Sequence, residues 1–397
     1  MKTPWLPASL ALLLPMVATA ADDPGSAWRF SDNWPTHYVF ADGTDLGLTL
    51  KYQYDIDRFS DDGSRLADAQ TNRRRELGFY LKKKGVYDVT AIYDYQSKTW
   101  QDTWLRVQGR ALVGRDVGAL RVGYTKTPVG FEGNTSTGAT TFLENSLPTQ
   151  AVYASRRIGI DWALERPHAV LNAGYYSGGD LNGDNDGRML GARAAWVPLH
   201  GPGHVLHLGL SASRESPAGS TDGRGIHTPP QARLGARAEA SLLPSRVLDS
   251  GTLAFADRID RRGVEALWID GPWSAQGEYL SSRVSFSNGR PDYRGHGYYA
   301  FVSWVATGES RPYSAGNVGN LKPKGRYGAL EFALRYSELD LDDRGVPGGR
   351  ERNWTLGANW YLNSYLKLQA NYVHVQSERR GLELDPQVFE VRAQLQF

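Results

Sequence analysis

The sequence has no cysteine, little methionine and no long hydrophobic run. Its 397 residues include 0 Cys and 3 Met, which excludes a disulfide framework, a thiolate nucleophile and a Cys-ligated zinc site. No apolar run reaches the 18 or so residues that a transmembrane helix needs, so a helical membrane protein is excluded. An excess of one charge is also lacking, because 45 Lys and Arg face 43 Asp and Glu. This balance argues against a nucleic-acid-binding protein.

Glycine and aromatic residues are abundant instead. The chain has 44 Gly, 21 Tyr, 12 Trp and 12 Phe, a composition typical of β-structure with many turns and aromatic belts. Its first residues are typical of an export signal, with Lys2, an apolar stretch over 10–18 and the small-residue pattern ATA over 18–20. We predict a signal peptide at 1–20, with Ala21 as the first residue after cleavage.

Apolar and polar residues alternate with a period of two through most of the remaining chain. In 46–54 every second residue is Leu or Tyr, which gives a strand one apolar and one polar face. We count seventeen to eighteen such runs, among them 234–240, and 248–258 is a candidate for one more. Tight turns such as 84–85 separate some runs, and longer polar segments such as 341–349 separate others.

Runs of about ten residues with aromatic ends match the length of a strand that crosses a bilayer at a tilt. A soluble β-sandwich is the alternative, but it typically has far fewer strands. The last strand ends in Phe397, and its outward positions include Phe389 and Val391; this terminal aromatic resembles the assembly signal of bacterial outer-membrane proteins. Lipid offers no backbone partners, so such a sheet must close. We predict an all-β fold, a closed antiparallel transmembrane β-barrel of about 16–18 strands over 45–397, after an N-terminal periplasmic segment at 21–44.

Several segments, in order along the chain, resemble the phosphate-selective porin O and P family. They are 123–128 (GYTKTP), 141–148 (TFLENSLP), 271–279 (GPWSAQGEY), 297–311 (GYYAFVSWVATGESR), 328–337 (GALEFALRYS) and 355–363 (TLGANWYLN). The resemblance implies a homotrimer of roughly sixteen-stranded barrels in the outer membrane of a Gram-negative bacterium, each barrel with its own pore and an inward-folded third loop. Outer-membrane lipid and the outer-membrane assembly machinery are the partners this location implies.

Inward-facing charges are the candidates for a pore lining. The alternation leaves a small excess of inward basic over inward acidic residues, and 35 of the 44 basic residues after the signal peptide are arginine. Arginine presents a planar fork that matches phosphate oxygens. The alternative for each cation is a wall charge paired with an acid on a neighbouring strand. The predicted anion path comprises Arg74, Arg75, Arg106, Arg110, Arg121, Lys126, Arg157, Arg233, Arg237 and Arg335.

Two connections are candidates for segments inside the lumen. Segment 128–155 is similar to a porin third loop, and the hydroxyl groups of Thr135, Ser136 and Thr137 would donate to an anion that sheds water in a constriction. The alternative is a flexible polar loop. Segment 308–328 lies by parity on the periplasmic side, and its Lys322 and Lys324, with Lys82, predict a basic periplasmic vestibule. Such basic turns are otherwise simply solvated.

Metal and catalytic patterns are weak. Asp180, Asn182, Asp184 and Asp186 resemble a calcium loop only superficially, because Asn185 and Gly191 stand where Gly and Glu are needed. No phosphate-binding loop or nucleophile elbow is present. We therefore predict no metal, no cofactor and no enzyme. The favoured function is passive diffusion of phosphate or related small anions into the periplasm; the alternatives are a general, weakly selective porin and an outer-membrane enzyme.

Overall fold

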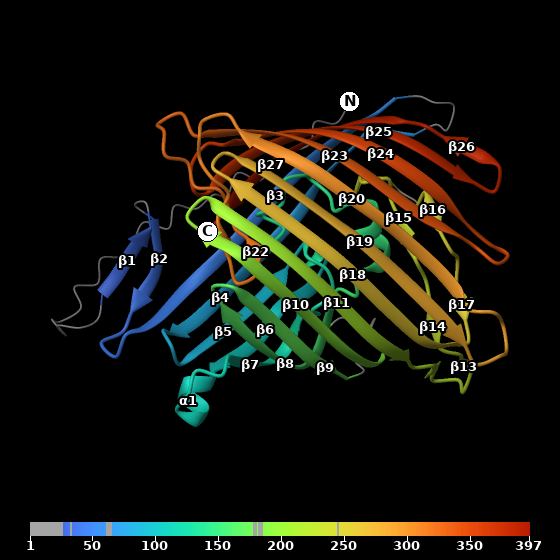
Figure 1. Cartoon of the computed structure of the whole chain (residues 1–397), viewed down its shortest axis with the longest axis horizontal. Coiled ribbons are helices and arrows are strands. Elements are labelled where there is room, and N and C mark those ends of the chain that lie inside the picture. The colour runs from blue at the N-terminus through green and yellow to red at the C-terminus, as the bar shows by residue number, and fades with distance from the viewer. Residues whose placement is uncertain (1–26, 32–33, 61–65, 178–180, 182–185, 244–245) are drawn as a thin grey trace, which may run out of the picture.

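The computed structural model describes residues 27–31, 34–60, 66–177, 181, 186–243 and 246–397. Sixteen antiparallel strands form a closed barrel (Figure 1), because the last strand pairs with the first from Val388↔Phe59 to Gln396↔Lys51. The wall strands are β3 (Thr44–Phe59), β4 (Ala69–Lys83), β5 (Tyr87–Asp94), β6 (Thr99–Gln108), β7 (Ala119–Lys126), β8 (Arg156–Arg166), β9 (Ala169–Tyr176), β10 (Gly187–Gly201), β11 (His204–Pro217), β18 (Ala256–Asp270), β19 (Trp273–Phe286), β20 (Tyr293–Val305), β23 (Ala329–Asp343), β24 (Val346–Tyr361), β25 (Leu366–Arg379) and β27 (Gln387–Gln396).

The remaining elements are short. β1 (Ala27–Ser31) and β2 (Trp34–Val39) extend the sheet beside β3, and β26 (Leu382–Leu384) pairs with the end of β25. The short helices are α1 (Gly109–Val113), η1 (Glu132–Asn134) and α2 (Leu147–Val152). Four short two-stranded sheets lie in the connections: β12 (Ser220–Thr221) with β13 (His227–Thr228), β14 (Gln231–Ala232) with β17 (Leu253–Ala254), β15 (Gly235–Ala236) with β16 (Leu248–Asp249), and β21 (Tyr313–Ser314) with β22 (Asn317–Val318). The predicted signal peptide at 1–20 lies outside the described residues.

The barrel fold is confirmed, and its sixteen wall strands are at the lower end of the predicted range, so not every alternating run is a wall strand. The run 234–240 belongs to the connection between β11 and β18 and is not a wall strand. Likewise 248–258 adds no wall strand: it contains the short strands β16 and β17, and β18 begins only at Ala256. Segment 341–349 is a hairpin and not a long polar connection, because β23 reaches Asp343 and pairs with β24 at Val346.

The two ends of the barrel differ. We call the end with the connections β4–β5, β10–β11, β18–β19 and β24–β25 the turn rim, because these connections are short. Phe397 lies at this end, where its backbone N–H donates to Leu50 O at 3.0 Å. We call the opposite end, which carries the connection between β7 and β8 and that between β11 and β18, the loop rim.

The outer surface carries apolar residues and two aromatic belts. Towards the turn rim Trp304 stacks with Trp273, with ring centroids 5.7 Å apart. About halfway along the strands, and so nearer to the loop rim than the tryptophan pair, Tyr336 contacts Tyr298 and Trp354, at 5.9 and 4.9 Å between ring centroids. Belts of this kind are typical of the two membrane–water interfaces of an outer-membrane barrel. Within the described ranges no helix has the length and apolar character to cross a membrane.

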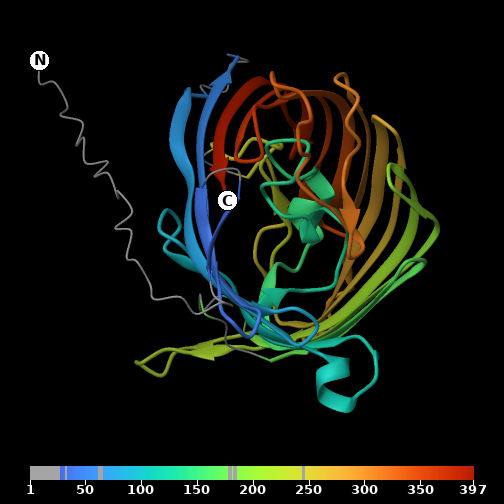
Figure 2. The ribbon, with the colours of Figure 1, turned by 90° about the vertical axis from the view of Figure 1, so that its left-hand side faces the viewer.

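Three segments occupy the lumen. We call them the third loop (127–155, between β7 and β8), the fifth loop (218–255, between β11 and β18) and the inner turn (306–328, between β20 and β23). Figure 2 shows α2 of the third loop inside the ring of strands. The third loop contacts inward side chains of β11, β19, β23, β24, β25 and β27.

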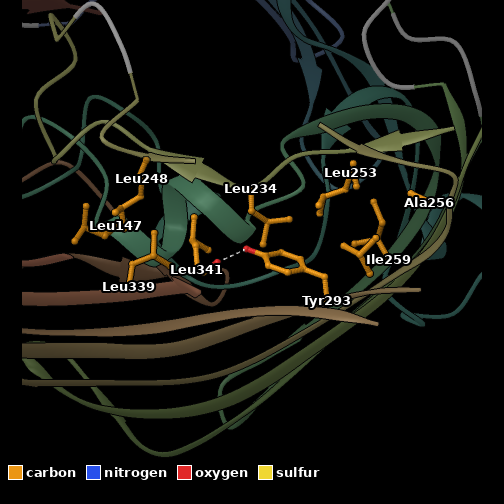
Figure 3. Packing of buried hydrophobic residues seen from close by; sticks show 12 residues of the cluster. Leu147, Leu234, Leu248, Leu253, Ala256, Ile259, Tyr293, Leu339 and Leu341 are labelled. Atoms are coloured by element: carbon orange, nitrogen blue, oxygen red, sulfur yellow. Dashed lines mark hydrogen bonds between the residues drawn. The ribbon is translucent and has the colours of Figure 1, made fainter. Parts of the chain in front are cut away.

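The fifth loop covers an apolar part of the inner wall (Figure 3). Leu234 and Leu248 of this loop, with Leu147 of α2, belong to one buried cluster with wall residues of β18, β20 and β23. In the same cluster the Tyr293 hydroxyl donates to Leu341 O at 2.9 Å. Apolar residues on the lumen face of a porin strand would otherwise meet water, so burial under the fifth loop accounts for them. The lumen is therefore filled along the wall from β18 to β27.

Candidate functional site

Glu144 ties the third loop to two wall arginines. Its Oε1 lies 3.1 Å from Arg73 Nε on β4 and 2.9 Å from Arg392 Nη2 on β27. Arg392 also binds Asp55 of β3, at 2.6 Å from Nη2 to Oδ2. Burial opposes ionisation of the Glu144 carboxyl, but the two guanidinium groups prevail and lower its pKa to about 2. The loop is thus clamped at the seam where β27 meets β3.

Arg335 of β23 joins the third and fifth loops. Its side chain is fully buried, with Nη2 2.7 Å from Glu239 Oε2 of the fifth loop and Nη1 3.0 Å from Glu144 O of the third loop. The guanidinium carbon lies 4.3 Å from the centroid of the Phe142 ring. Glu132 Oε1 is 3.5 Å from Nη1. Arg335 is therefore an internal anchor and is not exposed to a passing ion.

Around Gly138 and Ala139 the third loop contacts β25, β27 and the inner turn. A Cβ atom at Gly138 would lie 1.8 Å from Gln396 Oε1, so a larger residue here would displace the Gln396 side-chain amide of β27. Lys367 Nζ donates to Gly138 O at 3.1 Å. On the inner turn, buried Arg311 donates to Ala139 O at 3.1 Å and pairs with Glu331 of β23.

An arginine-lined cavity opens beside the third loop on the opposite wall, towards the loop rim. Its volume is about 700 Å³, and its lining includes residues of β4 to β6, β8, β11 and β18 together with parts of the third and fifth loops. We call it the vestibule. Three acidic residues line it, Asp94, Asp186 and Glu215. Six arginines line it, namely Arg73, Arg74, Arg156, Arg157, Arg233 and Arg261. Arginines thus outnumber acids two to one on the lining of the vestibule.

Acidic side chains orient these arginines. Arg156 binds Asp102 through two bonds of 3.1 Å. Arg261 Nη1 lies 2.6 Å from Glu215 Oε2, and Arg157 binds the other oxygen of the same carboxylate. A guanidinium group has five N–H donors in a fixed fork, so one carboxylate leaves donors for a second anion.

A chain of charges links the vestibule to a smaller cavity at the turn rim. Glu76 accepts from Arg74 at 3.0 Å and from Lys51 at 2.7 Å. Arg74 lines the vestibule, whereas Lys51 and Glu76 line the second cavity, of about 280 Å³. Lys126 interacts electrostatically with Arg74, Lys51 and Arg156 and donates from Nζ to Thr135 O at 2.6 Å. A cationic row therefore runs along the wall that the loops leave uncovered.

Several predicted path residues lie where the alternation places them. Arg74 and Arg157 face the vestibule. Arg106 and Arg121 are opposite each other on β6 and β7 near the turn rim, and both guanidinium groups lie 5.7 Å from the Trp104 ring centroid. Each is paired with an acid, Arg106 with Asp88 at 2.8 Å and Arg121 with Asp161 at 3.0 Å.

Other predicted positions are corrected by the structure. Arg110 is on α1 beyond the end of β6, so it cannot share an inward strand face with Arg106. Arg75 is exposed, has the parity of the exposed Leu77 and binds Gln96 at 2.7 Å, so it points out of the barrel. Arg233 and Arg237 are on the fifth loop and not on a wall strand; Arg233 still lines the vestibule.

The predicted hydroxyl donors are only partly available. Thr135 Oγ1 donates to Phe131 O at 3.2 Å and to Asn317 Oδ1 at 2.8 Å, so its proton already has acceptors in the protein. Ser136 lines the turn-rim cavity, and Thr137 contributes its carbonyl to Gln53. Lys82, Lys322 and Lys324 were predicted to form a basic vestibule on the periplasmic side, at the turn rim. Their side chains are exposed, on β4 and the inner turn.

Sequence reasoning missed Arg73, Arg156 and Arg261 as vestibule residues. Arg73 faces inward beside Arg74 because a bulge shifts the register of β3 and β4 at Gln53, and no alternation rule finds such a shift. Arg261 could have been found by extending the alternation of β18 to its loop-rim end, whereas Arg156 has the parity of the exposed Ile160, so alternation does not place it in the lumen. The weak calcium pattern at 180–186 lies mostly outside the described residues; in the described part no cluster of His, Asp and Glu fits a metal ion.

The low pKa of Glu144 gives a pH-dependent stability. The folded pKa of about 2 lies below the usual 4.5, so the carboxylate stabilises the fold above about pH 4.5, and this contribution is lost as the pH falls through 2. We expect Glu144→Gln to lower the midpoint of heat unfolding at pH 6 and this difference from the wild type to shrink towards pH 2. Heat-dependent gel mobility at each pH measures the midpoints of both proteins. A difference in midpoint that stays constant with pH would contradict the low pKa of Glu144.

The model of one protein family, phosphate-selective porin O and P, matches residues 45–397. The chain belongs to this family. It is accordingly an outer-membrane β-barrel of a Gram-negative bacterium. Porin O from Pseudomonas aeruginosa is 29% identical over 237 residues, 53% of this chain and 53% of that protein. An uncharacterized protein from Caulobacter vibrioides is 29% identical over 248 residues, 58% of this chain and 48% of that protein. The chain thus spans about half the length of the curated relatives it matches.

Solved porins share the fold. An anion-selective porin from Comamonas acidovorans superposes with a TM-score of 0.55 at 12% identity, covering 89% of this chain and 100% of that one. The trimer form of OmpT from Vibrio cholerae gives a TM-score of 0.57 at 10% identity, covering 89% of this chain and 99% of that one. At such identities the likeness shows the barrel architecture alone.

Proposed function

We propose that this porin is a passive channel for phosphate or related small anions, which enter at the loop rim and leave into the periplasm at the turn rim. The observation that carries the proposal is the vestibule, where six arginines face three acids beside the wall that the loops leave open. An ion in this cavity meets several oriented guanidinium groups at once, and such forks match the oxygens of phosphate.

The charged row below the vestibule supports passage as well as binding. Conduction requires sites that attract an ion but hold it weakly. Glu76 between Arg74 and Lys51, and Asp102 beside Arg156, limit how tightly each cation holds an anion. Diffusion down a gradient through such a row needs neither a cofactor nor an energy source. The fold and family support a channel rather than an enzyme.

A general, weakly selective porin is the second candidate, favoured by the pairing of most lumen arginines with acids. We propose a homotrimer, which the trimeric Vibrio cholerae structure supports by its shared fold. The anion selectivity named for the Comamonas acidovorans porin agrees with the favoured function.

Recording from planar bilayers tests these functions. In a tenfold KCl gradient we expect a reversal potential of the sign for anion selectivity, and phosphate added at millimolar levels should lower the chloride current by competing for the same guanidinium groups. Closure of the conductance in three equal steps would support the trimer. A chloride current that phosphate leaves unchanged would favour the general porin, and a cation-selective current would refute the anion channel.

A further inference from the structure

A second arginine cluster lies on the outer surface of the barrel. Near the loop rim Arg262 of β18, Arg283 of β19 and Arg294 of β20 line a groove of about 490 Å³. All three are exposed and share the outward parity of Val264, Tyr279 and Tyr298. We call this the outer arginine groove. It is separate from the lumen, so the proposed conduction does not use it.

The strand register brings the three arginines together. Arg283 and Arg294 are directly opposite each other on neighbouring strands. Arg262 is opposite Ser281, which is opposite His296, two residues from Arg294. With strands about 4.8 Å apart and a rise of about 3.3 Å per residue, the Cα atoms of Arg262 and Arg294 are about 12 Å apart. Flexible arginine side chains can converge over that span on one anionic group.

The acids around the groove are engaged elsewhere. Asp260 binds Arg214 at 2.8 Å and Arg258 at 2.9 Å. Asp343 and Asp342 also line the groove, but each has a cationic partner outside it: Arg344 Nε lies 3.9 Å from Asp343, and Arg350 Nε lies 3.8 Å from Asp342. Arg283 pairs with Asp292, which leaves it beside the like charge of Arg294.

The cluster therefore carries positive charge in excess. Among the described residues no ion pair forms through the side chain of Arg262 or Arg294. Like charges directly opposite each other on neighbouring strands are destabilising. An external anion seated between these side chains would relieve that repulsion.

The depth of the groove points to the membrane surface. Tyr279 and Tyr298, opposite each other on β19 and β20, belong to the aromatic belt near the loop rim. Arg294 is four residues beyond Tyr298, about 13 Å along the strand. Side chains just beyond an aromatic belt lie at the level of lipid headgroups.

We propose that the outer arginine groove binds the phosphate groups of the glycolipid that forms the outer leaflet of the outer membrane. Arg262, Arg283 and Arg294 supply charged forks for phosphate oxygens. The Ser281 hydroxyl lies between them as a further donor. The Tyr279 ring, 6.2 Å from that of His296, forms the apolar edge below, where acyl chains begin.

Binding of a defined glycolipid to the detergent-solubilised protein tests this proposal. The probes are bisphosphorylated lipid A and the same lipid without its phosphates, both with EDTA present so that no divalent cation bridges them. We expect the wild type to prefer the phosphorylated form by at least tenfold, and Arg262→Gln with Arg294→Gln to lose at least tenfold in affinity for it. Arg58→Gln with Arg352→Gln is the matched control, since these exposed arginines of β3 and β24 lie outside the groove and are paired with Asp68 and Glu338; its affinity should change less than twofold.

Unchanged heat-dependent mobility and unchanged conductance of the groove variant would show that the barrel and its channel are intact. The proposal is overturned if the groove variant binds lipid A within twofold of the wild type, or if the dephosphorylated lipid binds equally well. It is also overturned if phosphatidylglycerol binds as tightly, because the groove would then not distinguish the glycolipid.

Discussion

Replacing Arg335 with methionine is expected to enlarge the open lumen and to destabilise the protein. Arg335 is fully buried and binds Glu239 of the fifth loop and the Glu144 carbonyl of the third loop. Its removal leaves the buried Glu239 without this partner. Breaking a buried ion pair from one side costs about 3–5 kcal/mol. Release of both loops should raise the single-channel conductance several-fold, reduce its anion selectivity and lower the midpoint of heat unfolding.

The control for this variant is Arg352→Met on β24. Arg352 is exposed on the outer surface and lies 3.4 Å from Glu338, and exposed pairs contribute about 0–1 kcal/mol. The conductance and heat stability of Arg352→Met should stay near those of the wild type. A wild-type conductance in Arg335→Met, together with reduced heat stability, would show that Arg392, Lys367 and Arg311 hold the third loop without Arg335.

The barrel could be predicted from the sequence because every wall strand meets the same physical constraint. Each wall strand must be apolar towards lipid and polar towards the lumen, so a period of two is imposed on every strand, as in 46–54. Closure follows from the absence of backbone partners in lipid. The alternation therefore predicted inward Arg74, Arg106, Arg121 and Arg157 correctly, each paired with an acid in the structure.

The same rule fails where the chain is not a wall strand. The run 234–240 alternates because one face packs inside the lumen, and this apolar face is indistinguishable in sequence from a lipid-facing one. Arg110 was placed on β6 by extending the alternation past Gln108, where α1 begins. A bulge turned Arg73 inward, whereas Arg75 follows the regular outward parity of Leu77. The error at 234–240 arises because alternation reports that one face is buried but not what buries it. The errors at Arg110 and Arg73 arise because alternation does not show where a strand ends or bulges.

Loop anchoring could not be read from the sequence for a different reason. Glu144 meets Arg73 and Arg392, which are 71 and 248 residues away along the chain. Such contacts depend on the path of the third loop across the lumen, and no local pattern encodes this path. The predicted hydroxyl donor of Thr135 was assigned from composition alone, whereas the structure gives this hydroxyl internal acceptors.

Removing two vestibule arginines is expected to abolish anion selectivity. Arg74→Gln with Arg156→Gln takes two positive charges from the passage and leaves Glu76 and Asp102 without them. Charged rings set the sign of selectivity in narrow pores, so the reversal potential in a tenfold KCl gradient should move to zero or to the cation side. Planar-bilayer recording measures this shift. An unchanged potential would place the ion path away from these residues.

A double variant that keeps the net charge distinguishes an effect of charge on the current from recognition of phosphate. Arg74→Gln with Glu76→Gln removes one charge of each sign, so the net charge of the passage is kept and Lys51 remains beside it. Chloride selectivity should therefore stay near wild type. If guanidinium forks recognise phosphate, this variant should need several-fold more phosphate to reduce the chloride current, since the glutamine amide that replaces the Arg74 guanidinium donates without charge and without the fork. If phosphate reduces the current equally in both proteins, the Arg74 guanidinium acts only as charge, and recognition rests with the other vestibule arginines or is absent.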